Sequence, residues 1–276
     1  MTTAQENPAE YIMRLGQAGE GPHDIATAAL MLAALDHSTR SLEPYKAHLS
    51  EIAEAARTEG RLTAHVEDGA RALSALLVGR YGYDGDRIAY DDPQNADFIA
   101  VMDRRRGLPV ALGILYMHAA RAAGFQACGL NTAGHFLLRI TVRGSEALID
   151  PFNGGAAIDP EKLGAPPGRG SQAVEDIRLA EPVSDSEVLL RLENNLKMRA
   201  INSGERARAL EIAHRMVLIA PKRAELWVDL AKINEAVGAL GAAQKAYEAC
   251  LALVKAGSPL HNEAALAHQT LKRKLN

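Results

Sequence analysis

The expected fold is decided by residues 109–150, which read PVALGILYMHAARAAGFQACGLNTAGHFLLRITVRGSEALID. A strongly apolar helix is predicted from Pro109, a residue tolerated in a first helical turn, to Gly124, which suits the position after a helix end. Strand-like runs follow, and a polar turn around Gly144 separates the last two. A buried helix followed by antiparallel strands predicts a small α+β core.

Helices are expected on the N-terminal side of this core. Asp24 can cap the first, Pro44 suits the first turn of the second, and a third is predicted over residues 64–81. We therefore expect residues 1–81 to form a helical region that packs on the core, and residues 82–165 to form the core itself.

A repeat pattern marks the C-terminal part of the chain. The tetratricopeptide unit is a helix–turn–helix of about 34 residues. Its spacing is matched by Trp227, Ala231, Gly238, Ala243 and Tyr247. One unit earlier, Gly204 and Ala209 keep the turn glycine and a small residue of the second helix. We expect two all-α repeats and a closing helix over residues 186–276, preceded by a Gly- and Pro-rich linker at residues 166–185.

Composition and charge exclude several classes of function. Hydrophobic residues make up 47% of the 276 residues, as in globular proteins, and the net charge of −3 offers no general attraction for nucleic acid. No signal-like leader and no run of about 18 apolar residues is present, so we expect a cytoplasmic protein without a membrane partner. The histidines and the two cysteines, Cys128 and Cys250, form no metal-binding motif, so neither a metal nor a cofactor is expected.

His135 and Asp150 form the candidate chemical pair. They open one predicted strand and close the next, and a hairpin that turns near residues 141–144 would place them opposite each other. A turn centred nearer Gly144 would offset them. In a nucleophilic triad the aspartate orients the imidazole, which takes the proton of the nucleophile. The alternative is a structural histidine that a carboxylate holds at a strand end.

Four motifs of the chain resemble the transglutaminase-like domain of the Sir-B-type bacterial regulator proteins, which carry tetratricopeptide repeats after that domain. The motifs are YDDPQN (90–95), RRRGLPVALGILYMHAARAAG (104–124), NTAGHFLLRI (131–140) and LIDPFNGG (148–155). The resemblance extends over residues of about 30 to 276. It implies a papain-like α+β core and a pairing of His135 with Asp150.

In active transglutaminase-like enzymes the nucleophile is a cysteine at the start of the buried helix, where the helix N-terminus and a histidine lower its pKa. The corresponding residues 107–113 read GLPVALG and contain no Cys, Ser or Thr. We therefore expect a degenerate core, a pseudoenzyme in which His135 and Asp150 are vestigial. Cys128, the alternative nucleophile, is expected to be a small packing residue.

Three polar residues are candidates for a pocket beside His135: Asn131, Asp92 and Asn95. An Asx-type turn is the structural alternative for the last two. The run Arg104–Arg106 has two interpretations as well. It can contact an anion or a partner near the pocket mouth, or it can end a solvated helix and pair with Asp103 or Asp97.

The favoured hypothesis is a non-enzymatic protein-interaction or regulatory protein, whose C-terminal repeats dock a protein partner. With only two repeats, their surface can instead pack on the core. The alternative hypothesis is a hydrolase or transferase in which His135, oriented by Asp150, acts as a general base without a covalent cysteine intermediate.

Overall fold

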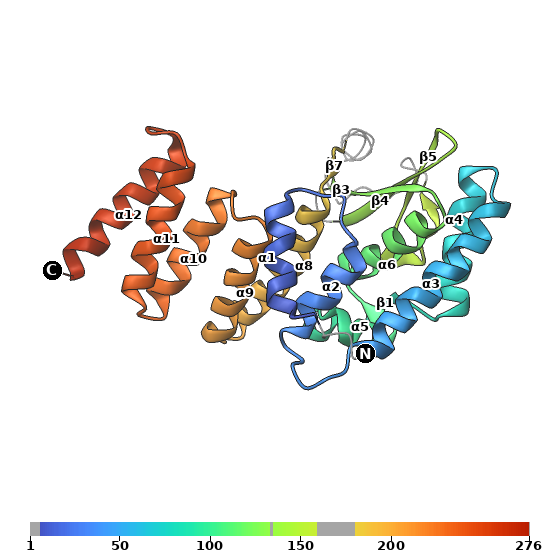
Figure 1. Cartoon of the computed structure of the whole chain (residues 1–276), viewed down its shortest axis with the longest axis horizontal. Helices are drawn as coiled ribbons and strands as arrows, with labels where there is room; N and C mark the ends of the chain where they lie inside the picture. The colour runs from blue at the N-terminus through green and yellow to red at the C-terminus, as the bar shows by residue number, and fades with distance from the viewer. Residues whose placement is uncertain (1–5, 133–134, 159–179, 276) are drawn as a thin grey trace. The chain divides into compact units, whose positions relative to one another are not determined.

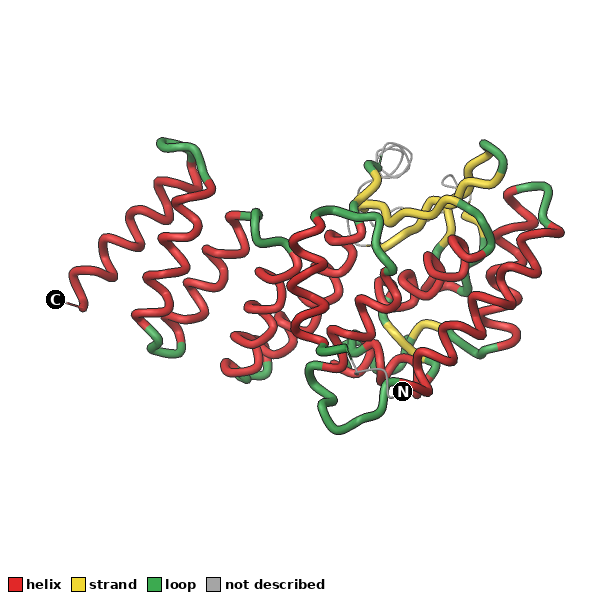
Figure 2. Tube along the Cα trace, in the orientation of Figure 1, coloured by secondary structure: helices red, strands yellow, loops and turns green. Residues whose placement is uncertain are grey.

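The computed structural model of the chain describes residues 6–132, 135–158 and 180–275 (Figure 1). Two compact units make up the chain: Gly21–Leu192 form the first, and Met1–Glu20 together with Glu193–Asn276 form the second. Figure 2 shows that the strands gather in the first unit, whereas the described part of the second consists of helices and loops. The predicted α+β class is confirmed.

The first unit begins with helices whose ends follow local signals. They are α2 (Ile25–Ala34), α3 (Glu43–Leu62) and α4 (Val66–Ser74), followed by a π-helical turn, η1 (Ala75–Arg80). Asp24 caps α2 by accepting a hydrogen bond from the Thr27 amide, and Pro44 lies in the first turn of α3, as expected. The third predicted helix differs from the structure, because its C-terminal part widens into η1.

The central helix of this unit is α6 (Pro109–Ala122), which is preceded by α5 (Phe98–Arg104) and a short parallel pair, β1 (Asp84–Gly85) and β2 (Arg106–Gly107). Apolar side chains surround α6, which buries it on all sides. Gly113 permits contact with the sheet, since a Cβ there would lie 2.4 Å from Cε1 of Phe136. The helix therefore forms the core of the unit.

An antiparallel sheet packs on α6. It consists of β3 (Gln126–Thr132), β4 (His135–Val142), β5 (Ser145–Ile149), β6 (Ala157–Ile158) and β7 (Pro182–Val183), in the order β6-β5-β4-β3-β7. Arg143 and Gly144, both with positive φ, form the two-residue turn between β4 and β5. This turn pairs Val142 with Ser145 and fixes the register of the hairpin.

The predicted linker at 166–185 falls partly outside the described residues, which resume at residue 180. Its last residues belong to the sheet, because Pro182 and Val183 pair with β3. A proline is accommodated there since β7 is an edge strand. Only after β7 does α8 (Asp185–Asn202) begin. The described end of this segment is therefore part of the core rather than a linker.

The second unit contains the expected helical pairs. After α8 it continues with α9 (Arg206–Ile219), α10 (Ala224–Ala236), α11 (Leu240–Leu253) and α12 (Pro259–Leu275). Gly204 and Gly238 adopt positive φ in the turns between paired helices. Ala231, Ala243 and Tyr247 are buried where α10 packs on α11.

The helix α1 (Pro8–Ala18) lies against α9 in this second unit. Gly16 allows the approach, because a Cβ there would lie 1.9 Å from the carbonyl oxygen of Leu218. This arrangement differs from the expected single N-terminal region over residues 1–81. Among the described residues, no helix of either unit is long and apolar enough to cross a membrane.

Candidate functional site

The start of α6 is the position at which the resemblance implies a nucleophile. The side chains of Leu108, Val110 and Ala111 are buried there, and the N-cap residue Leu108 makes no side-chain capping bond. The Leu108 amide donates to the Asn95 carbonyl oxygen at 2.8 Å. The first turn of α6 thus offers apolar packing and no group that could attack a substrate.

Asn95 holds the preceding loop against the start of α6. The side chain is fully buried, and its Nδ2 donates to the Ala89 carbonyl oxygen at 2.6 Å. Its Oδ1 accepts a hydrogen bond from Arg104, which also donates to Asp86 at 3.0 Å and lies 3.6 Å from a carboxylate oxygen of Asp92. The amide of Ala89 is the main group that lowers the pKa of Asp86. The cluster therefore orders the loop.

Asp92 and Asn95, two of the predicted pocket residues, come together around Arg104. Asp92 accepts a hydrogen bond from the Gln94 amide and caps the short helix η2 (Pro93–Asn95). These contacts are of the kind that the Asx-turn interpretation predicts. The side chains of Asn131 and His135 lie outside the described part of the chain. The predicted pocket that Asp92 and Asn95 would share with His135 therefore stays a prediction. The predicted role of Asn131 stays a prediction for the same reason.

Asp150 is buried and caps the short helix η3 (Pro151–Asn153). Its Oδ1 accepts from the backbone amides of Phe152 and Asn153 at 2.9 and 3.3 Å. Its Oδ2 accepts from Nδ2 of Asn153 at 2.6 Å. Both carboxylate oxygens thus have partners within the turn that follows β5.

The register of the β4–β5 hairpin offsets His135 from Asp150. Leu138 pairs with Ile149, so the residue after Ile149 lies nearer to Leu137 than to His135, whose backbone pairs with Thr132. This is the offset expected for a turn centred near Gly144 rather than the directly opposed arrangement. A contact between the two side chains stays a prediction.

The two cysteines do not lie at a helix N-terminus. Cys128 is in β3 opposite Arg139, and Cys250 is buried in the last turn of α11. Burial raises the pKa of both thiols. A protonated thiol is a poor nucleophile, so neither cysteine has the activation that an acyl transfer needs.

The arginine run pairs differently from the expectation. Asp103 accepts from Arg40 at 2.7 Å and Asp97 contacts His37 at 2.6 Å, so neither aspartate pairs with the run. Arg104 pairs instead with Asp86 and lies near Asp92, and Arg105, with a left-handed backbone of φ 57°, ends α5. Arg106 instead donates to the Gly82 carbonyl oxygen.

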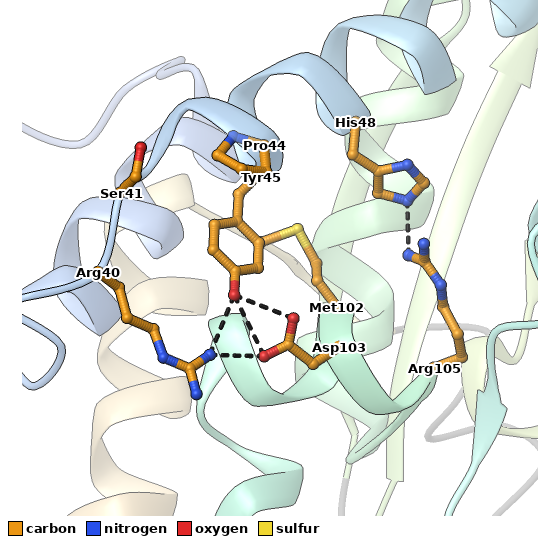
Figure 3. A pocket seen from close by; sticks show the side chains of 8 residues that line it. All are labelled: Arg40, Ser41, Pro44, Tyr45, His48, Met102, Asp103 and Arg105. Atoms are coloured by element: carbon orange, nitrogen blue, oxygen red, sulfur yellow. Dashed lines mark hydrogen bonds and ion pairs between the residues drawn. The ribbon is translucent and has the colours of Figure 1, made fainter.

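A cleft of about 490 Å³ lies between the first turn of α3 and the end of α5 (Figure 3). It is lined by Arg40, Ser41, Pro44, Tyr45, His48, Met102, Asp103 and Arg105. Asn131, Asp92, Asn95, His135 and Asp150 are not among them, whereas Arg105 belongs to the arginine run that the sequence singled out. Sequence reasoning missed the cleft because its two walls are far apart in the chain, and the arginine run was its one local signal.

No metal site emerges among the described residues, where no three His, Cys, Asp or Glu side chains gather in a way that could hold an ion.

A family model described as the transglutaminase-like superfamily matches residues 43–194, more than half of the chain. The chain belongs to the transglutaminase-like superfamily. A tetratricopeptide repeat model matches residues 196–271. The predicted order, a transglutaminase-like core followed by tetratricopeptide repeats, is therefore confirmed, and α6 is the core helix of a superfamily member that has GLPVALG at its start.

Several curated proteins are similar to parts of this superfamily member. The UPF0162 protein of Xylella fastidiosa strain Temecula1 is 33% identical over 163 residues, which cover 57% of this chain and 58% of that protein. The UPF0162 protein of Vibrio cholerae is 37% identical over 84 residues, 30% of this chain and 31% of the relative. The chain thus spans less than two thirds of the length of these relatives.

A mammalian protein matches a shorter part. F-box only protein 21 of Mus musculus is 30% identical over 82 residues, which cover 30% of this chain and 13% of that protein. No solved structure matches the chain.

Proposed function

We propose that the protein is a non-enzymatic interaction or regulatory protein of the Sir-B type. Its transglutaminase-like core lacks the nucleophilic cysteine and acts as a scaffold, and its repeats dock a protein partner in the cytoplasm. The observation that carries this proposal is the first turn of α6, where Leu108, Val110 and Ala111 are buried apolar residues.

The surroundings of that turn support a scaffold role. Asp150 uses both carboxylate oxygens to cap η3, and Asn95 holds the loop before α5 against the start of α6. These polar groups stabilise the local backbone through contacts that need no substrate. The alternative, a general base formed by His135 and Asp150, depends on the side chain of His135, which lies outside the described part of the chain.

The repeat helices offer apolar side chains for a docking surface. Large side chains that are exposed in the second unit include Met198, Ile201, Leu253 and Leu266. Tetratricopeptide repeats generally bind peptides or proteins, and exposed apolar residues of this kind provide the contact area that protein interfaces use.

The docking proposal can be tested by affinity capture with the full chain as bait. Leu266, 68% exposed in α12, is replaced by aspartate, and Leu62, 80% exposed at the end of α3, is replaced in the matched control. We expect a specific partner from a lysate of the source cells to bind the wild type and the Leu62→Asp variant, and to be lost with Leu266→Asp. A partner that depends on Leu62 and not on Leu266 would contradict docking through the repeats.

A further inference from the structure

The cleft between α3 and α5 is not used by the docking proposal. Its volume of about 490 Å³ is within the range of roughly 300–1,000 Å³ that small-molecule sites occupy. Figure 3 shows that Arg40 and Arg105 enter it from opposite sides, with Tyr45 and Asp103 between them. Its hydrogen-bonding groups therefore decide what it can hold.

Arg105 is a half-buried cation whose described partners are neutral. Its Nη1 donates to Nε2 of His48 at 2.6 Å and to the hydroxyl of Tyr83, and its guanidinium lies 4.6 Å from the centre of the Tyr83 ring. Burial raises the pKa of Tyr83, and burial followed by the charge of Arg105 lowers the pKa of His48. Both partners are thus uncharged near neutral pH.

Among the described residues, no carboxylate forms an ion pair with Arg105, and its Nε and Nη2 have no hydrogen-bond acceptor there. A partly desolvated guanidinium is costly unless an anion pairs with it. Two parallel N–H groups on one planar cation match the two oxygens of a carboxylate or phosphate.

The backbone of Arg105 gives a second reason to assign its side chain a role. The residue adopts φ 57° at the end of α5, a conformation in which glycine or asparagine is the favoured residue. Strained positions of this kind are concentrated at ligand sites. Here the residue with this backbone is one of the two arginines that line the cleft.

The opposite wall of the cleft also has hydrogen-bond donors without an acceptor among the described residues. Nη1 of Arg40 donates to Asp103 at 2.7 Å and to the Tyr45 hydroxyl at 3.0 Å, and that hydroxyl in turn donates to Asp103. The Asp103 carboxylate is therefore satisfied within the wall. In the described part of the chain, Nε and Nη2 of Arg40 and the Ser41 hydroxyl proton have no acceptor. Two guanidinium groups against one carboxylate leave the cleft with a net positive charge.

We propose that this cleft binds a small molecule through an oxyanion, a carboxylate or a phosphate, which Arg105 holds with its Nε and Nη2 groups while Arg40 contacts it from the other wall. The site goes beyond docking through the repeats and does not depend on it. The start of α6 takes no part in it.

Thermal unfolding and calorimetric titration of the full chain test this site. Inorganic phosphate and citrate are the two probes, each compared with sodium chloride at equal ionic strength, since a ligand of the folded state raises the unfolding midpoint. We expect at least one probe to raise the midpoint above the chloride value. Phosphate alone would identify a phosphate ligand, citrate alone a carboxylate ligand, and both together a site for either group.

Two variants separate the site from general charge effects. Arg105→Asn removes the guanidinium with a residue that tolerates left-handed backbone, and Arg106→Gln removes the same charge one residue away, outside the cleft. Binding is expected to weaken about tenfold or more in the first and to stay within about twofold in the second. If Arg105→Asn does not fold, Arg40→Gln replaces it with the same expectation. No stabilisation by either probe, or equal losses in the cleft variant and in Arg106→Gln, would overturn the proposal.

Discussion

At the scale of single residues, Asp150 shows how a residue of a family motif can stabilise the backbone without a role in catalysis. Replacing it by alanine removes the side-chain acceptor of two backbone amides at the start of η3, in partly buried surroundings. We expect the free energy of unfolding to fall by about 1–3 kcal/mol. Asp150→Asn keeps one acceptor oxygen and should lose less, which urea unfolding can measure. Equal stability of the alanine variant and the wild type would refute the capping role.

Cys128 gives a second prediction. Because burial raises the pKa of its thiol, little thiolate is present near neutral pH. We expect folded protein to react with iodoacetamide at Cys128 more slowly than free cysteine does, and unfolded protein to react at the ordinary rate. Peptide mass spectrometry identifies which cysteine is modified. Fast modification of Cys128 in the folded protein would contradict this prediction and favour Cys128 as a nucleophile.

His48 makes stability depend on pH. Burial and the charge of Arg105 lower its pKa below the usual 6.5, although Glu51 opposes them, so the folded protein keeps it neutral where the unfolded chain binds a proton. The contribution of neutral His48 to the free energy of unfolding is present above about pH 6.5 and is lost as the pH falls below that value. Urea unfolding at about pH 7.5 and pH 5.5 should show a smaller loss of stability on acidification for His48→Gln than for wild type. An equal loss would contradict the shift.

At the scale of elements, close approach explains several positions. Gly113→Ala in α6 would press a Cβ against Phe136, and we expect a loss of about 1–3 kcal/mol despite the better helix propensity of alanine. In the control, Gly241→Ala in α11, the added Cβ meets open space. That variant should be neutral or gain up to about 1 kcal/mol. Chemical unfolding of both variants checks the contrast.

The junction of α6 and α8 depends on a buried ion pair. Arg121 contacts both carboxylate oxygens of Asp185 at 2.7 Å, and the His23 amide donates to the same carboxylate. Because the Asp185 side chain is only 4% exposed, Asp185→Ala leaves the part-buried Arg121 guanidinium without a carboxylate, and we expect a loss of about 3–5 kcal/mol. Glu54→Gln, which breaks the exposed pair with Arg57, should cost less than about 1 kcal/mol. Similar losses in both variants would contradict the argument.

Local signals explain how much of these elements the sequence could predict. The bounds of α6 and the turn at Gly144 follow from proline, glycine and apolar spacing within a few residues. The strand β7 could not be predicted, because Pro182 and Val183 gain their conformation by pairing with β3 far away in the chain. The cleft was missed for the same reason, since the contact of Arg105 with His48 joins segments that no local pattern relates.

At the scale of the whole molecule, the two family matches meet within α8, between residues 194 and 196. The Gly- and Pro-rich segment at 166–185 lies inside the first match, and its residues 166–179 lie outside the described part of the chain, so its role as a linker stays a prediction. The repeats were predicted more sharply, because small residues and turn glycines recur at a fixed spacing that packing requires.

We propose that this transglutaminase-like core performs no acyl transfer. The direct measurement is the incorporation of a labelled primary amine into a glutamine-containing peptide by purified full-length protein, with His135→Ala as the matched variant. We predict incorporation no higher than without protein, for wild type and variant alike. Incorporation by the wild type that is lost in His135→Ala would contradict the account.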